Sequence, residues 1–373
     1  MKKHRVWAEV NLGQLGRNMD FMRARLGPDV KVTVVVKADA YGHGAVPVAK
    51  TCLEHGAFML AVGDSNEAIQ IRESGILAPI LVLGALIDEE LSWVVSYDIR
   101  PTIHSVERVP ALNDAARRLG RTCKVHVKVD TGLGRLGASP YQALEIARRV
   151  ASSPHLELEG LSTHLAAAST GDVAFTQRQI RTFQGVLSEI EGMGIRVPYR
   201  HAANAAGALA FPETVFNMVR PGASLYGIDP GNLRDQGIPM DPILTLKTQI
   251  AFIKGHPEGA NIGYNRTYAT QRRTRIATLP VGYNDGYPHR LSNQANVIVR
   301  GRLAPVAGTV TMDYTTVDVG AIPDARVGDE VVLIGRQGDH QVRAEELAKI
   351  VGTTPYEIPC QLGRRVRRVY LEG

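Results

Sequence analysis

The chain has 373 residues, of which 44% are hydrophobic and 21% are charged. This composition is that of an ordinary soluble protein able to bury a large core, and the length makes two domains the default expectation. The net charge of +6 is mild and widely spread. It is compatible with small anionic ligands such as a phosphate or a carboxylate, and we expect no nucleic-acid partner.

The cysteines and the N-terminal residues indicate the cellular compartment in which the protein is expected. The three cysteines form no Cys-x-x-Cys pair, which argues against a disulfide framework and against a zinc site, so we expect no metal. The basic N-terminus is not followed by an apolar segment, so we expect no signal peptide. No stretch approaches the ~20 apolar residues of a membrane span. These features predict a cytoplasmic protein.

Apolar, β-rich runs alternate with helical patterns through the first two thirds of the chain. Eight runs predict strands, at 31–38, 57–62, 79–84, 99–104, 123–130, 156–164, 199–204 and 216–222. Segments with apolar residues three and four positions apart predict helices at 65–74, 106–119, 141–150 and 177–193. This α/β alternation predicts a closed (β/α)8 TIM-like barrel, although strand count alone does not exclude a doubly wound sheet.

The pattern changes near Pro230-Gly231-Asn232. From Ile243 onward, alternating residues predict strands at 244–253, 275–279, 296–299, 315–319 and 330–334, with one short helix at 344–351. The sequence therefore predicts two domains: a barrel over residues 1–236 and a mainly β C-terminal domain over residues 237–373.

The first predicted strand ends at Lys37. An amine at the end of a buried strand can be desolvated, kept neutral and used as a nucleophile, although a lysine that only snorkels outward is the structural alternative. Barrel enzymes carry their sites at the C-terminal ends of the strands. Polar residues occupy five of these ends: Lys37; Lys128 and Asp130, with Arg135 just beyond them; His164; Asn204; and Arg220, followed by Gly222.

Three other signals are weaker. Residues 132–137 spell G-x-G-x-x-G, but they interrupt the fifth unit instead of opening the first, which disfavours a dinucleotide site. Arginines cluster at 364–368 without interleaved aromatic residues, which favours a solvated strand or turn over a nucleic-acid site. Tyrosines beside glycines at 263–268 and 282–287 indicate half-buried turns when taken alone, and residues 310–313 indicate a plain strand.

The segment from Val34 to Gly44 resembles the cofactor-lysine signature of the alanine racemases, which use pyridoxal 5'-phosphate (PLP). The resemblance extends from residues 7–12 to residues 356–358 and the closing arginines, so it covers essentially the whole chain. It implies a PLP-binding barrel followed by a β domain, assembled as a head-to-tail homodimer with shared active sites. The implied activity is the interconversion of L- and D-alanine, which in bacteria supplies peptidoglycan synthesis.

The resemblance implies two catalytic bases. Lys37 corresponds to the lysine that holds the cofactor and acts as one base, and Tyr264, reaching in from the partner subunit, corresponds to the other. Two opposed bases suit racemisation, because a proton leaves one face of Cα and another arrives on the opposite face. Tyrosine has an unperturbed pKa of about 10, so the phenolate needs favourable neighbours, a role implied for His164 and Arg220.

Arg220 corresponds to an arginine that faces the pyridine nitrogen of the cofactor. A guanidinium only donates, so the ring nitrogen stays unprotonated and is a weaker electron sink, which discourages side reactions. Other residues match family positions that contact the cofactor phosphate, the substrate carboxylate or the access corridor. They are Tyr41, Asn204, Gly222 and Tyr356 around the phosphate, Arg135 and the backbone at Met312 for the substrate carboxylate, and Tyr283 as an inner tyrosine of the corridor.

Lys128 sits where many family members carry a carbamylated lysine, whose negative charge orients the arginine that corresponds to Arg135. We expect carbamylation here, because an unmodified Lys128 would place a second cation beside Arg135. The chain also departs from the family. Ala205 replaces a serine of the phosphate cup, and Thr309 and His289 stand where arginines are common near the substrate corridor.

These departures keep alternatives open. A racemase of broader range, accepting serine or lysine, is the main one. A non-catalytic PLP-binding protein also uses a barrel with a lysine, but it lacks a second domain with residues such as Tyr264 and Tyr283. A PLP-dependent decarboxylase is disfavoured, because we expect its ring nitrogen to face a carboxylate and not an arginine such as Arg220.

Overall fold

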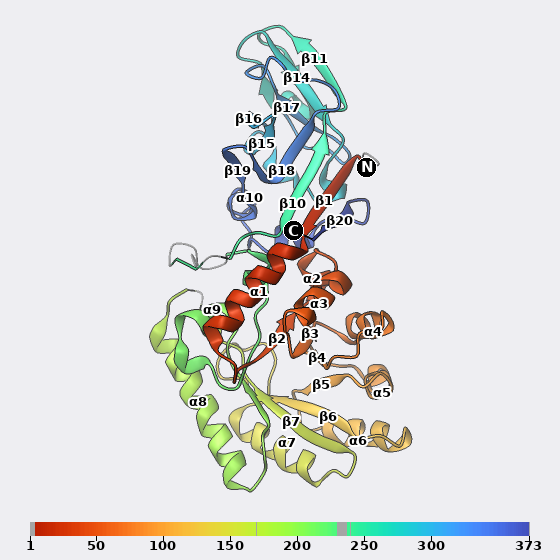
Figure 1. The fold of residues 1–373 in the computed structure, drawn as a ribbon, viewed down its shortest axis with the longest axis vertical. Helices are drawn as coiled ribbons and strands as arrows, with labels where there is room; N and C mark the ends of the chain where they lie inside the picture. Colours follow the sequence, from red (N-terminus) through yellow and green to blue (C-terminus); the bar gives the residue numbers. More distant parts are fainter. Residues whose placement is uncertain (1–3, 169, 230–236, 239, 373) are drawn as a thin grey trace. The chain divides into compact units, whose positions relative to one another are not determined.

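The computed structural model describes residues 4–168, 170–229, 237–238 and 240–372, and it falls into two compact units (Figure 1). The first, here called the barrel unit, comprises Gly16–Ala40 and Ala45–Leu225. The second, the β unit, comprises the chain up to Leu15, Tyr41–Gly44 and the chain from Tyr226 onward. The predicted change of character at 230–232 and the domain boundary after residue 236 fall on residues outside the described ranges.

Eight parallel strands form the sheet of the barrel unit. They are β2 (Lys31–Val35), β3 (Met59–Val62), β4 (Ile80–Val82), β5 (Arg100–Ile103), β6 (Cys123–Lys128), β7 (Leu156–Ser162), β8 (Tyr199–His201) and β9 (Met218–Val219). They pair in the order β8-β7-β6-β5-β4-β3-β2-β9. A parallel bridge between Asn204 and Arg220 links the two ends of this order. The near-closed ring confirms the predicted barrel and excludes a doubly wound sheet.

Helices alternate with these strands, as the sequence pattern predicts. They are α1 (Leu12–Leu26), α3 (Ala45–Glu54), α4 (Ser65–Glu73), α5 (Leu91–Ser96), α6 (Arg108–Arg118), α7 (Pro140–Ser152), α8 (Val173–Gly192) and α9 (Ala205–Ala210). The cause is clearest in α7, where Ser139 caps the N-terminus and Pro140 occupies the first turn. Its buried residues recur three and four positions apart, from Ala143 to Val150, and pack the helix against the barrel.

The described residues of the β unit form three sheets, one of which includes the N-terminal strand, and two short helices. A seven-stranded sheet has the order β16-β15-β18-β10-β1-β20, with β19 paired to β18. Its strands are β1 (Val6–Asn11), β10 (Leu244–Gln249), β15 (Asn296–Val299), β16 (Arg302–Pro305), β18 (Glu330–Gln337), β19 (His340–Val342) and β20 (Arg367–Leu371). The smaller sheets contain β11 (Phe252–His256), β14 (Thr274–Leu279) and β17 (Thr315–Asp318), and β12 (Asn261–Ile262) with β13 (Tyr268–Ala269). The helices are α10 (Ala344–Val351) and α11 (Glu357–Cys360).

Two features of the β unit differ from the sequence pattern. Strand β1 begins the chain yet lies inside this sheet, where Ala8 opposes Leu246 of antiparallel β10 and Arg368 of parallel β20. The single strand predicted at 244–253 is divided into β10 and β11. At the break, the Ile250 N–H donates to the Asp329 carbonyl and the Ala251 N–H donates to the Thr278 carbonyl, so the chain passes from one sheet to another.

A membrane crossing needs a long apolar helix. Over the described parts of the chain, none of the helices combines the length and the hydrophobicity that such a crossing requires.

Candidate active site

Lys37 follows β2 and opens a left-handed turn. Ala38, Asp39, Ala40 and Tyr41 all have φ between 52° and 54°. The left-handed conformation costs roughly 1–2 kcal/mol for each L-residue, so it normally occurs at single residues and not in a run of four. Strain of this kind concentrates at functional sites, where surrounding contacts hold the backbone in place.

The Glu67 carboxylate supplies such contacts. It accepts the Ala38 N–H at 2.6 Å and the Gly63 N–H at 2.7 Å, so it ties the turn to the end of the neighbouring strand β3. On the far side of the turn, the Asp39 carboxylate accepts the N–H of Ala45, the first residue of α3, at 2.7 Å. The sequence pattern alone does not single out Glu67. Its signal is an acidic residue in the first turn of α4, a common capping position.

Cationic side chains, Lys37 among them, gather around His164 and Lys128. Burial lowers the pKa of His164 to about 3, and the positive charges of Arg220, Lys128, Arg135 and Lys37 contribute in that order. Burial also lowers the pKa of Lys128 to about 8, with Arg220 and Arg135 adding to the effect. At neutral pH the imidazole is therefore uncharged, and part of the Lys128 amine is uncharged as well. The structure places Lys37, Arg135 and Arg220 within electrostatic range of both His164 and Lys128.

Arg220 is 5% exposed and is held from two sides. Its Nη1 donates to the Nδ1 and the carbonyl oxygen of His201, at 2.8 and 2.9 Å. Its Nη2 donates to the carbonyls of Thr163 and Ala202, at 2.7 and 3.1 Å, and lies 3.3 Å from the Nδ1 of His164. Burial lowers the pKa of Arg220 to about 10, so the group is charged at neutral pH. All of these bonds involve Nη1 or Nη2 and none involves Nε.

Lys128 and Arg135 lie on either side of a loop that Asp130 organises. Burial alone would raise the pKa of Asp130, but hydrogen bonds from the N–H groups of Gly132 and Gly134 outweigh it and lower the pKa. The G-x-G-x-x-G segment is thus a loop folded over a carboxylate, and the next helix, α7, begins only at Pro140. Lys128 is buried and Arg135 is exposed.

Asn204 and Gly222 lie beside the bridge that links the ends of the barrel sheet. The Asn204 side chain caps α9 by accepting the Gly207 N–H at 2.8 Å. The Gly222 carbonyl accepts the Leu225 N–H at 2.8 Å in the turn that ends the barrel unit. Ala205, the first residue of α9, is buried. The predicted phosphate residues of the barrel unit therefore belong to two neighbouring turns.

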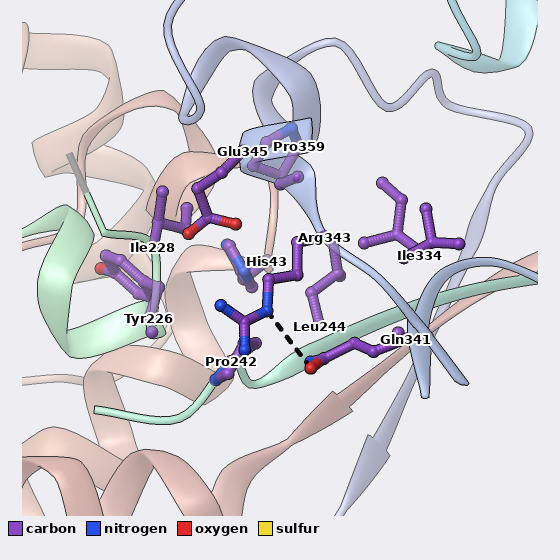
Figure 2. Close-up of a pocket in the computed structure, with 14 residues that line it drawn as sticks. His43, Tyr226, Ile228, Pro242, Leu244, Ile334, Gln341, Arg343, Glu345 and Pro359 are labelled. Atoms are coloured by element: carbon purple, nitrogen blue, oxygen red, sulfur yellow. Dashed lines mark hydrogen bonds between the residues drawn. The ribbon is translucent and has the colours of Figure 1, made fainter. Parts of the chain in front are cut away.

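The remainder of the lysine motif belongs to the β unit. His43 is fully buried and stacks on Tyr226 with ring centroids 4.9 Å apart. Both line a largely apolar pocket of the β unit (Figure 2). Burial raises the pKa of the Tyr41 phenol, so it keeps its proton. Tyr356 lies edge-on to Tyr41 at 6.4 Å.

The other predicted site residues lie on three adjoining segments of the β unit, 263–268, 282–287 and 309–314, here called the tyrosine loops. The Thr309 hydroxyl donates to the Tyr264 carbonyl at 3.2 Å, and the Tyr283 N–H donates to the Thr311 carbonyl at 3.0 Å. Their large side chains are exposed, at 71% for Tyr264, 53% for Met312 and 45% for Tyr283. His289 lies 6.5 Å from the Tyr283 ring. The predicted site residues are thus divided between the two units.

Three polar residues inside the barrel strands escaped sequence reasoning. They are His126 on β6, Glu159 on β7 and His201 on β8, all buried. The signal that could have found them is polar side chains at interior positions of strands that otherwise alternate into an apolar core.

A TIM-like barrel with a cluster of cationic side chains at one rim, joined to a mainly β unit, defines a barrel protein suited to an anionic ligand. Known proteins agree with this class. The family described as "Alanine racemase, N-terminal domain" matches residues 10–230, and "Alanine racemase, C-terminal domain" matches residues 243–370. The chain belongs to the alanine racemase family, whose members are PLP-dependent amino-acid isomerases.

Individual relatives span the whole chain. An alanine racemase from Halothermothrix orenii is 44% identical over 365 residues, covering 98% of this chain and 96% of that protein. One from Methanococcus maripaludis is 40% identical over 373 residues, covering 100% of both. The solved alanine racemase of a D-cycloserine-producing Streptomyces lavendulae has a TM-score of 0.95 at 33% identity, covering 100% of this chain and 98% of that one. The Bacillus anthracis enzyme with bound L-Ala-P has a TM-score of 0.93 at 36% identity, covering 100% and 96%.

Proposed function

We propose that this protein interconverts L- and D-alanine with PLP, using Lys37 and Tyr264 of the partner subunit as opposed bases. The observation that supports this most directly is the rim of the barrel, where Lys37 lies among Lys128, His164 and Arg220. Neighbouring positive charges favour a neutral amine, the form in which a lysine can attack a carbonyl or take up a proton.

The residues present fit PLP. When bound, this cofactor supplies an aldehyde for a lysine amine and a ring that withdraws electrons from the substrate's Cα–H bond. Arg220 is a buried, charged donor whose Nε–H is available for the acceptor nitrogen of the ring. Asn204 and Gly222, in neighbouring turns, and the protonated phenol of Tyr41 are suited to the phosphate, as is Tyr356.

The two bases have different tasks. Lys37 removes or returns the Cα proton on one face through its Nζ, and the phenolic oxygen of Tyr264 does so on the other. Arg135 and the backbone N–H of Met312 are the donors for the substrate carboxylate, and Tyr283 borders the corridor. His164, held neutral by burial, supports the phenolate of Tyr264 by hydrogen bonding and not by charge.

Exchange of the α-proton in deuterated water, followed by chirality analysis, tests the activity. The wild type should exchange and invert alanine. Tyr264→Phe should still exchange one enantiomer through Lys37 while inversion falls, whereas Lys37→Ala should do neither. Full racemisation by Tyr264→Phe would remove Tyr264 from the mechanism, and no exchange by the PLP-loaded wild type would remove the function.

We further propose a homodimer whose sites are shared, because the tyrosine loops expose large side chains that suit a partner surface. Mixing the two inactive variants Lys37→Ala and Tyr264→Phe tests this. With shared sites, each mixed dimer has one intact site, so random exchange restores about a quarter of wild-type activity. Sites built from a single chain restore none.

We also propose that the side-chain amine of Lys128 is carbamylated. The neutral amine, favoured by the lowered pKa of about 8, attacks CO2 and releases a proton, which replaces a cation by a carbamate beside Arg135. Intact mass before and after removal of CO2 should differ by one CO2 in the wild type and not in Lys128→Met. A bare amine under bicarbonate would contradict the proposal.

Substrate range is the remaining choice. Thr309 puts a neutral hydroxyl against the Tyr264 carbonyl, and His289 lies near Tyr283, where arginines are common in the family. A broader racemase is therefore the second candidate. Turnover on alanine, serine and lysine separates the two, since equal or faster turnover of lysine would end the preference for alanine. We place the activity in the cytoplasm, where D-alanine would feed peptidoglycan synthesis.

A further inference from the structure

Four side chains form a hydrogen-bonded relay inside the barrel unit. Arg220 Nη1 lies 2.8 Å from His201 Nδ1, and His201 Nε2 lies 2.7 Å from His126 Nδ1. His126 Nε2 lies 3.2 Å from Glu159 Oε2. Both imidazoles are fully buried, and Arg220 and Glu159 are 5% and 6% exposed. The relay therefore joins strands β6, β7 and β8 to the arginine at the rim.

The two ends of the relay decide where its protons lie. A guanidinium only donates, so His201 Nδ1 accepts and the His201 proton sits on Nε2. That proton is donated to His126 Nδ1, so the His126 proton also sits on Nε2 and is donated to Glu159. An ionised carboxylate only accepts, which closes the relay with one consistent direction.

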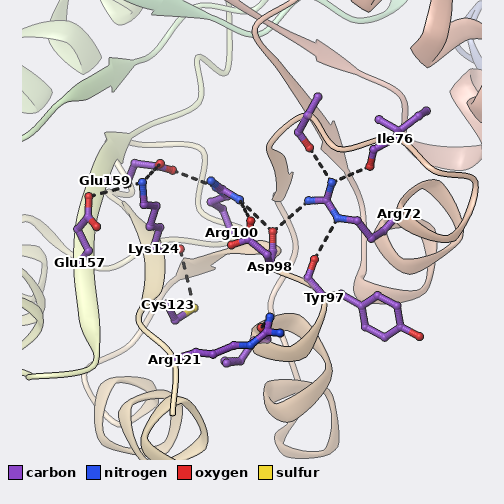
Figure 3. Close-up of polar contacts among 12 residues, drawn as sticks. Arg72, Ile76, Tyr97, Asp98, Arg100, Arg121, Cys123, Lys124, Glu157 and Glu159 are labelled. Carbon is purple, nitrogen blue, oxygen red and sulfur yellow. Dashed lines mark hydrogen bonds and ion pairs between the residues drawn. The ribbon is translucent and has the colours of Figure 1, made fainter. Parts of the chain in front are cut away.

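Glu159 is held in its ionised form from outside the relay (Figure 3). Arg100 Nε lies 3.5 Å from its Oε2 and Lys124 Nζ lies 3.7 Å from its Oε1. Burial alone would raise the pKa of Glu159, but the bond from His126 and the charges of Arg100 and Lys124 lower it. Glu159 therefore stays a pure acceptor at neutral pH.

Packing alone does not account for this arrangement. A buried charge pair contributes little compared with apolar residues of the same volume. The neighbouring strand β7 also has a glycine, Gly160, beside the His126 ring. Any larger residue would clash there, because a Cβ at Gly160 would lie 2.4 Å from His126 Nδ1.

We propose that Glu159 is a positioning residue for Arg220: acting through His126 and His201, it keeps His201 Nδ1 an acceptor and so holds the guanidinium in place toward the cofactor's ring nitrogen. This rests on the function proposed above. If His201 carried its proton on Nδ1 instead, two donors would meet at 2.8 Å and Arg220 would have to move.

The first test reads proton positions and needs no turnover. Nitrogen-15 NMR of the histidine rings in the PLP-loaded protein should report a proton on Nε2 of both His126 and His201. Glu159→Leu, which removes the acceptor, should shift both rings toward Nδ1–H, and Glu159→Gln, which keeps a carbonyl acceptor, should restore the wild-type pattern in part. Wild-type positions retained in Glu159→Leu, or a proton on Nδ1 of His201 in the wild type, would overturn the relay.

The matched control is Glu157→Gln. Glu157 lies two residues earlier on β7 and also faces Lys124, at 3.9 Å, but its side chain is 49% exposed. This variant should leave the histidine signals and the kinetics at their wild-type values. A shift of the histidine signals equal to that in Glu159→Leu would overturn the assignment to Glu159.

The second test asks whether the effect passes through Arg220. Glu159→Leu should lower kcat about tenfold with KM within about twofold, as expected for a residue behind the first contact layer. In an Arg220→Lys background the same change should cost less than about twofold, because coupled residues are not additive. An equal loss in both backgrounds would show a general structural effect and overturn the proposal.

A second variant guards against misfolding. If Glu159→Leu fails to fold, His126→Gln interrupts the relay one step nearer to Arg220 and carries the same two expectations for His201 and for kcat. Failure of the proposed function is a separate result, since a wild type without racemase activity can still show the predicted proton positions.

Discussion

Predicted site residues are buried at the rim of the barrel unit but exposed on the tyrosine loops of the β unit. In the barrel unit, Lys128 and Arg220 are 9% and 5% exposed, and hydrogen bonds from the same unit hold Arg220. In the β unit, Tyr264 and Met312 are 71% and 53% exposed. A chain can preorganise buried charges by itself, but exposed aromatic and sulfur-containing side chains gain a fixed environment only when another surface covers them. The barrel unit thus preorganises its buried charges, and the tyrosine loops expose the side chains on which the proposed contact with a partner subunit depends.

The largest expected effect concerns the lysine of the barrel unit. Lys37→Ala should lower racemisation by at least about 10⁴-fold, because it removes both the attachment point and a base. Cofactor absorbance and turnover measure this. Lys31→Ala, at the exposed start of the same strand β2, is the control and should retain wild-type turnover. Substantial turnover by Lys37→Ala would contradict the role of Lys37.

Tyr264→Phe tests the role of the exposed tyrosine loops of the β unit. Loss of a positioned acid or base should lower racemisation by about 10³-fold, without affecting stability, since the ring is retained at an exposed site. Tyr314→Phe is the control, because Tyr314 is also exposed and belongs to the same loops. Equal losses in the two variants would mean that the hydroxyl of Tyr264 has no special role.

Lys128→Met tests the cost of burying charge in the barrel unit. The pKa of Lys128 falls from 10.5 to about 8 on folding, so between these values the unfolded chain binds more protons and stability rises with pH. Burial of the charged Lys128 amine lowers the free energy of unfolding by up to about 3 kcal/mol at pH values below both pKa values. Urea denaturation from pH 7 to pH 10 without CO2 should show this slope in the wild type and lose it in Lys128→Met.

The control for this slope is Lys254→Met on the exposed strand β11, which should keep the wild-type dependence. The same pH dependence of stability in the wild type and in Lys128→Met would mean that Lys128 is not desolvated in solution.

The smallest effect concerns the support of the tyrosine loops. A Cβ at Gly282 would lie 2.2 Å from the Thr311 carbonyl oxygen, so Gly282→Ala must push the loops apart. We expect a loss of about 2 kcal/mol in stability and reduced turnover, because Tyr283 and Met312 move. Gly255→Ala, where a Cβ meets open space, is the control. If Gly282→Ala is less stable but turns over substrate at the wild-type rate, the position of the tyrosine loops does not matter for catalysis.

Much of the fold follows from local pattern. The eight barrel strands lie inside the predicted segments, because buried parallel strands are nearly continuous apolar runs. Helices α7 and α8 follow from their apolar spacing and capping residues. The β unit follows less completely. Strand β1 pairs with residues more than 230 positions away, and the break between β10 and β11 depends on partners near residues 278 and 329.

The candidate site divides in the same way. Lys37, Lys128, His164 and Arg220 follow from the rule that polar residues gather at the strand ends of a barrel. Glu67, His126, Glu159 and His201 do not, because their roles depend on which strands become neighbours. The matches of Tyr264, Tyr283 and Met312 rest on family resemblance, since tyrosines beside glycines have many structural uses.

The sequence by itself determined the alternation of strands and helices, the change to a β pattern and the family of this protein, because each depends on residue type and spacing along the chain. Only the tertiary structure decided that Ala38–Tyr41 form a left-handed turn, that β1 joins the β unit and that Glu159 reaches Arg220 through two histidines. The physical reason is that these features arise from contacts between distant residues. Local propensity favours a right-handed helix at Lys37–Tyr41, and contacts such as those of the Glu67 carboxylate overcome that preference.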